Sequence, residues 1–131
     1  MEYLLAVLAA AFSFAANRLF FEKWEAQTIV ALSPVVEESA KTLPAYYLNS
    51  DILIIHLLFG VIEGALDFWR SGKSGALPGL LSVAGHSAFG ALTMLLFNLT
   101  ANIIMAFSGA VIAHIAWNAA VNRLAKKTIE S

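Results

Sequence analysis

Residues 34–41 read PVVEESAK and place Glu37, Glu38 and Lys41 inside a chain whose long stretches are otherwise apolar. Of the 131 residues, 60% are hydrophobic and 13% are charged, whereas soluble domains usually carry about 25% charged residues. This composition is typical of a membrane protein. An ionisable group inside a membrane segment is costly and indicates a functional site. The three charged residues therefore predict a bundle of helices built around a polar interior.

Five apolar segments follow one another, with short polar stretches between them. Each is close to the roughly 20 residues that a helix needs to cross a bilayer, and none alternates like a barrel strand. We therefore expect an all-α fold, a polytopic transmembrane helical bundle that forms a single membrane domain over residues 1–131. The predicted spanning helices lie near residues 3–21, 27–48, 51–69, 77–97 and 101–122.

The basic residues favour one orientation of this bundle, because Lys and Arg near helix ends are retained on the cytoplasmic side. All of them except Lys41 fall in the first loop, the third loop and the tail, which lie on one side of a five-helix bundle. We expect a multi-pass protein of the cell membrane, in contact with lipid, with its N-terminus outside and its C-terminus in the cytoplasm. The net charge of −1 gives no indication of a nucleic-acid partner.

Four of the predicted helices carry ionisable residues at similar depth. Counting about 1.5 Å per residue from the cytoplasmic ends places Glu37, Glu63, His86 and His114 roughly 9–16 Å deep. Each such group costs at least about 2.5–3.5 kcal/mol near the bilayer centre unless it is paired or hydrated. A shared layer therefore predicts a polar cavity inside the bundle.

The spacing within each segment indicates how these side chains are used. Glu37 and Glu38 lie about 100° apart on a helix, and Lys41 is within reach of both. One glutamate can pair with Lys41 while the other faces the cavity. His114 and Asn118 are four residues apart, so they share one helix face.

Glycines lie close to Glu63 and His86 in the sequence. Gly60 and Gly64 form a small-xxx-small face next to Glu63, which lets another helix approach closely. Gly85 and Gly90 flank His86 and permit close backbone approach there. We expect these glycines to serve packing.

Carboxylates and imidazoles in a polar cavity can hydrolyse an acyl bond. A partly desolvated glutamate can act as general base towards water, and a neutral histidine can help to hold that water or a metal ion. An imidazole N–H and an Asn amide can donate to a developing oxyanion. Carboxylate and histidine ligands also suit Zn²⁺, so a metal-assisted reaction and a metal-free glutamate reaction both stay open. The absence of cysteine excludes a thiol nucleophile.

Four motifs in order, EESAK (37–41), FGVIE (59–63), GHSAFG (85–90) and HIAWN (114–118), resemble those of the PrsW family of intramembrane proteases. That family belongs to a wider clan with the CAAX prenyl proteases and the bacteriocin-immunity proteins. The resemblance covers residues 34–122 and implies an intramembrane peptidase that cleaves a membrane-anchored protein substrate.

The resemblance also implies a role for each matching residue. Glu37 would activate water together with His86, and Glu38 would be held by Lys41. His114 and Asn118 would stabilise the oxyanion, and Glu63 would support the site or bind metal. In the metalloprotease interpretation, Zn²⁺ ligands would come from Glu37, Glu63, His86 and His114. The chain is short for the family, which leaves the substrate less defined than the chemistry.

Other interpretations of the same residues must be considered. Glu37, Glu38 and Lys41 could form a structural ion-pair group. The protein could then be a non-catalytic membrane scaffold or binding subunit that keeps a protease-like polar core. His56 is expected to be structural or interfacial, and Asp67 is expected to be interfacial. An ion pathway is disfavoured, because the outer halves of the last two helices carry few polar residues.

Self-association is a further expectation. Five short helices are few for sealing a hydrated cavity from lipid, and the glycine faces offer contacts for a second copy. We therefore expect a homo-oligomer.

Overall fold

The computed structural model describes residues 1–23 and 26–130, and this part of the chain is helical without any strand. The predicted all-α class is confirmed. The five α-helices lie close to the predicted ranges, although the last one continues eight residues beyond its predicted end at residue 122. The elements are α1 (Glu2–Phe21), α2 (Ala26–Tyr47), α3 (Ile52–Ser71), the 3₁₀ turn η1 (Gly72–Gly75), α4 (Ala76–Thr100) and α5 (Ile103–Glu130).

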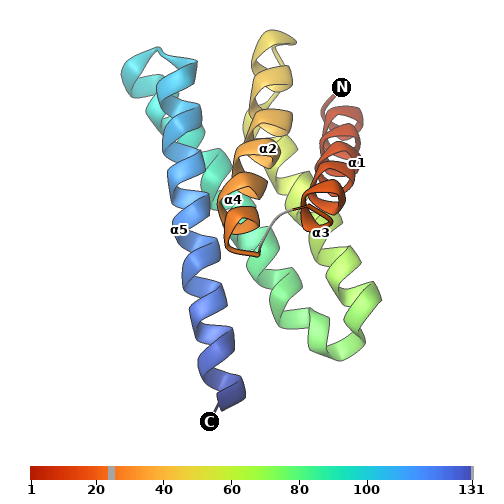
Figure 1. The fold of residues 1–131 in the computed structure, drawn as a ribbon. Coiled ribbons are helices and arrows are strands. Elements are labelled where there is room, and N and C mark those ends of the chain that lie inside the picture. Colours follow the sequence, from red (N-terminus) through yellow and green to blue (C-terminus); the bar gives the residue numbers. More distant parts are fainter. Residues whose placement is uncertain (24–25, 131) are drawn as a thin grey trace.

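In the described part of the chain, three helical stretches are long and apolar enough to cross a membrane: Glu2–Phe20, Ile52–Thr100 and Ile103–Leu124. The second contains α3, η1 and α4, which double back on each other (Figure 1). Many large apolar side chains on these stretches are exposed, as lipid-facing side chains would be. The protein is therefore suited to a membrane. Five spans and their orientation stay predictions.

Helices α3 and α4 pack closely because glycines face each other across their interface. A Cβ atom added at Gly64 would lie 2.7 Å from the carbonyl oxygen of Gly79, and one added at Gly79 would lie 2.7 Å from that of Gly64. A Cβ at Gly60 would come within 3.1 Å of the Cβ of His86. The predicted close approach is confirmed, and it brings the polar side chains of α3 and α4 together.

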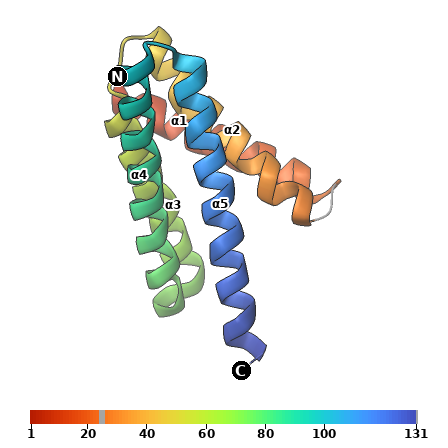
Figure 2. The same ribbon diagram turned by 90° about the vertical axis from the view of Figure 1, so that its left-hand side faces the viewer.

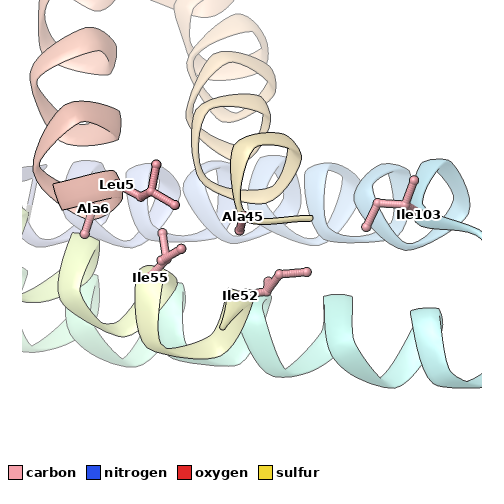
Figure 3. Packing of buried hydrophobic residues seen from close by; sticks show 6 residues of the cluster. All are labelled: Leu5, Ala6, Ala45, Ile52, Ile55 and Ile103. Carbon is pink, nitrogen blue, oxygen red and sulfur yellow. The ribbon is translucent and has the colours of Figure 1, made fainter. Parts of the chain in front are cut away.

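Apolar side chains join the helices at the end where the N-terminus lies. Leu5 and Ala6 of α1 meet Ile52 and Ile55 of α3 there, with Ala45 and Ile103 completing the cluster (Figure 3). This packing fixes one end of the bundle. At the other end α1 and α2 turn away from α3, α4 and α5 (Figure 2).

Candidate functional site

Glu38 of α2 lies at the centre of a buried polar cluster. Its Oε1 atom accepts a hydrogen bond from Lys41 Nζ at 2.7 Å and another from His114 Nδ1 at 2.9 Å. The Lys41 and Glu38 side chains are completely buried. The prediction that one glutamate pairs with Lys41 is confirmed, and that glutamate is Glu38.

The contact with Glu38 shows that Nδ1 of His114 carries a hydrogen. A carboxylate oxygen only accepts, so the Nδ1–H of His114 donates to it, and in the neutral tautomer that makes this bond Nε2 carries no proton. The Nε2 atom lies 3.7 Å from Oε2 of Glu37. In that tautomer two acceptor atoms face each other across a gap that is too long for a direct hydrogen bond.

Two neutral donors hold the other oxygen of the Glu37 carboxylate. Ser33, one turn earlier in α2, donates to Oε1 at 2.7 Å, and the Asn17 amide of α1 donates to the same atom at 3.0 Å. The Glu37 side chain is almost fully buried, so these bonds fix its orientation. Its Oε2 atom is left directed towards His114.

His86 of α4 is held from both sides of its ring. Lys41 Nζ lies 2.8 Å from Nδ1, and Glu63 Oε2 lies 2.7 Å from Nε2. Because the ammonium group donates and the carboxylate accepts, Nδ1 is the acceptor and Nε2 carries the proton. Ser82 also donates to Glu63 Oε2, at 2.6 Å. His86 thus links the buried cation to the acid of α3.

A cavity of about 870 Å³ opens beside these groups, and all five α-helices contribute to its wall. Its volume lies within the roughly 300–1,000 Å³ range of ligand pockets. Polar side chains gather around the catalytic candidates, and apolar ones from α4 and α5 form much of the remaining wall. The polar lining consists of Asn17, Ser33, Glu37, Glu63, Asp67, Ser82, His86, His114, Asn118 and Asn122.

Three buried side chains form a group that could hold a metal ion: Glu37, His86 and His114, whose ligand atoms all lie within 4.8 Å of one another. Tetrahedral zinc ligands at 2.0–2.1 Å from the ion stand only about 3.4 Å apart, so the group would have to contract. His86 would also have to release Lys41 or Glu63 to free a ring nitrogen. The fourth predicted ligand, Glu63, lies outside this group and contacts His86 instead.

The structure brings all of the predicted site residues to one place. Glu37, Glu63, His86, His114 and Asn118 line the cavity, while Glu38 and Lys41 lie behind it, linked to His114 and His86. Their catalytic roles stay predictions. Asn118 lies one turn beyond His114 on the same side of α5, as its spacing predicts.

The sequence analysis did not predict the side chains that donate hydrogen bonds to Glu37 and Glu63. Ser33 could have been found, since it stands four residues before Glu37 on the same helix face. Ser82 stands four residues before His86, which gives the same signal. Asn17 lies on α1, outside the motifs, and only the fold places it beside Glu37.

His56 lies behind the cluster, completely buried. Its Nε2 atom is 3.2 Å from the Thr42 hydroxyl, and its Nδ1 atom faces Glu38 Oε2 at 3.7 Å. Neither Nδ1 of His56 nor Oε2 of Glu38 has a hydrogen-bond partner among the described residues. His56 was expected to be structural or interfacial. It lies in the interior, where its ring faces the Glu38 carboxylate.

No protein-family model matches the chain, and neither a curated protein nor a solved structure matches it. The chemistry of the site must therefore be argued from its own geometry.

Proposed function

We propose that this protein is an intramembrane protease of PrsW type, which hydrolyses a peptide bond of a membrane-anchored protein in the cell membrane. The observation that carries the proposal is the pair of acceptors Glu37 Oε2 and His114 Nε2, 3.7 Å apart in the wall of the cavity. A water molecule can donate one hydrogen to each of them. A lone pair of its oxygen is then available to attack a substrate carbonyl in the cavity.

In this mechanism Glu37 acts as general base. It removes a proton from the water while the oxygen forms a bond with the carbonyl carbon, and the carbonyl oxygen takes up the negative charge. When the C–N bond breaks, Glu37 returns the proton to the leaving amine. The two donors on Oε1 keep the carboxylate aligned during both steps.

His114 and Asn118 have different parts in this scheme. Because Glu38 holds the Nδ1–H of His114, the neutral ring accepts from water through Nε2 and cannot also donate to an oxyanion. The side-chain amide of Asn118, on the cavity wall, is then the donor for the developing charge. Glu38 and Lys41 position the two histidines and do not touch the substrate.

A zinc-assisted form of the same reaction would use Glu37, His86 and His114 to hold the ion. Zinc would polarise the scissile carbonyl and supply nucleophilic water near neutral pH. The Lys41 ammonium group, 2.8 Å from His86 Nδ1, opposes a second cation there and favours the metal-free form.

The test is cleavage of a panel of single-span peptides by the purified protein in lipid vesicles. We expect wild-type protein to cleave at least one peptide and Glu37→Gln to lose about 100-fold or more of the rate. Glu22→Gln, which changes an exposed acid of the loop after α1, is the matched control and should keep full activity. Zinc content is measured in the same preparations, before and after treatment with a chelator.

The outcomes separate the candidate functions. Activity that survives chelation in zinc-free protein supports the glutamate mechanism, whereas loss on chelation and recovery with zinc supports the metal-assisted one. Equal cleavage by Glu37→Gln would contradict the assignment of the base. Absence of cleavage over a broad panel would favour the non-catalytic scaffold, for which the buried cluster is only structural.

A further inference from the structure

The fully charged side chains on the cavity wall are all acidic. Glu37, Glu63 and Asp67 contribute carboxylates, and among the described residues no Lys or Arg lines the cavity. Lys41 is sealed behind the site, and Arg70 lies over an aromatic ring of α1 at 5.7 Å. A cavity lined by one sign of charge between low-dielectric walls concentrates ligands of the opposite sign.

Asp67 differs from the other two acids because the protein does not use its carboxylate. Oε1 of Glu37 and Oε2 of Glu63 each accept two hydrogen bonds from neighbouring side chains. Within the described ranges, Asp67 has no ion pair and no side-chain hydrogen bond, although the charge of Arg70, three residues further along α3, partly offsets its own. It lies one turn beyond Glu63, about 6 Å further along α3 towards η1. Its carboxylate oxygens are therefore open to hydrogen bonds from a ligand in the cavity.

The wall near Asp67 also presents a long apolar surface. Leu77, Pro78 and Leu81 of α4 and Val121 of α5 line the same cavity. A chain of apolar residues can pack against these side chains while a basic residue reaches the carboxylate. The cavity is thus complementary to a peptide segment that has both apolar and basic residues.

We propose that the substrate segment is an extended peptide in which Lys or Arg adjoins a run of apolar residues, within about four residues of the scissile bond. Asp67 is the residue that determines this specificity. The range follows from the chain of contacts from Glu37 through His86 and Glu63 to Asp67, at about 3.3 Å per residue of extended peptide. The inference rests on the proposed function and names the substrate class of that site.

The first experiment measures binding rather than cleavage, with the Glu37→Gln protein in zwitterionic lipid nanodiscs. Three fluorescent peptides share an apolar run and differ at one adjoining position, which is Lys, Gln or Glu. We expect the Lys peptide to bind about tenfold more tightly than the Glu peptide. Adding Asp67→Asn should remove this preference, and adding Asp67→Lys should reverse it.

The matched control is Asp51→Asn in the same background. Asp51 caps the other end of α3 through a bond to the backbone N–H of Ile54, which Asn can also make. This variant should keep the full Lys preference. Equal binding of the three peptides, or a preference that persists in Asp67→Asn, would overturn the inference.

Cleavage of the same peptides by protein with an intact Glu37 separates this inference from the proposed function. Cleavage in the order Lys, Gln, Glu supports both. Tight binding of the Lys peptide without any cleavage supports the basic-segment site and contradicts the protease. Cleavage without charge preference supports the protease and overturns the role of Asp67.

Discussion

At the scale of single residues, Glu38 organises the site although it does not reach the cavity. It fixes the Nδ1–H of His114 and neutralises Lys41, and Lys41 in turn contacts His86. The two histidines on the cavity wall thus depend on one buried carboxylate, which does not itself line the cavity.

Replacing Lys41 by Met should destabilise the protein strongly. The change leaves Glu38 as a buried charge without its cation, which typically costs about 3–5 kcal/mol in the free energy of unfolding. We expect the double variant Lys41→Met/Glu38→Gln to recover much of this loss, because it removes both charges. Unfolding in mixed micelles with increasing denaturing detergent measures both values.

Arg18→Met provides the control for charge removal. Arg18 and Glu22 form an exposed pair at 3.8 Å, which should contribute less than about 1 kcal/mol. If Lys41→Met cost no more than Arg18→Met, Lys41 would not be neutralising a buried acid.

Loss of the Ser33 hydroxyl should slow catalysis without weakening substrate binding. Ser33→Ala removes one of the two donors on Glu37 Oε1 and leaves the carboxylate less well oriented. We expect kcat to fall about tenfold with an unchanged KM, consistent with the roughly 1.5–3 kcal/mol of a hydrogen bond to a charged group. Ser39→Ala is the control, since its hydroxyl bonds only to the backbone of Val35 on an exposed face of α2. Equal losses in the two variants would argue against an orienting role for Ser33.

The two ring nitrogens of His56 can be tested separately, because Asn and Gln each place an amide near one of them. Asn places its amide near the Nδ1 position, which faces Glu38, whereas Gln places it near the Nε2 position beside Thr42. We expect His56→Gln, which keeps the hydrogen bond with Thr42, to lose about 1 kcal/mol less in the free energy of unfolding than His56→Asn, because Nδ1 of His56 makes no hydrogen bond with the described residues. The reverse order would mean that the approach of Nδ1 to Glu38 is the more important contact.

The motif residues could be placed from sequence, but their hydrogen-bond partners could not. Helical spacing pairs Lys41 with a glutamate and sets Asn118 beside His114. Contacts between distant helices, such as Asn17 with Glu37, depend on how the helices cross. The burial of His56 behind Glu38 has the same origin, and no local pattern signals it.

At the scale of helices, the α3–α4 contact sets the position of two site residues. The backbones meet at Gly64 and Gly79, and Glu63 on α3 contacts His86 on α4. Any change that separates the two backbones should therefore lengthen the contact between the acid and the imidazole.

Gly64→Ala is expected to destabilise the protein by about 1–3 kcal/mol, because the new methyl group meets backbone atoms that cannot move aside. Catalytic activity should fall together with stability. The measurements are unfolding in mixed micelles and peptide cleavage. Ala65→Leu, on an exposed position of the same helix, should change neither, and a silent Gly64→Ala would show that the interface tolerates a wider spacing.

Helix positions were accessible to sequence analysis because apolar runs and polar separators mark them directly. The small-xxx-small pattern likewise predicted a close helix contact at Gly60 and Gly64. Which helix would fill that contact did not follow from the pattern, since glycine shows only where a neighbour can approach. The turning away of α1 and α2 from the other helices was also not predicted.

At the scale of the whole molecule, the number of spans and their direction can be measured directly. The chain has no cysteine, so single-cysteine variants can be labelled without background. We expect a cysteine at Lys73 to react only when the reagent reaches the cytoplasmic side, and one at Asn102 to react from outside. Labelling of both from one side would contradict the five-span orientation.

The partners of Glu38 come from α2 itself and from α5, and this has a consequence for how the protein is made. The ribosome completes α2 long before it reaches His114, and α2 is not among the stretches apolar enough to span a membrane. If α2 spans the membrane as predicted, it is made before His86 and His114 are available to its charged side chains, and Glu38 then has Lys41 as its partner. In the predicted five-span arrangement, we therefore expect the completion of α5 to limit when α2 can settle in the bilayer.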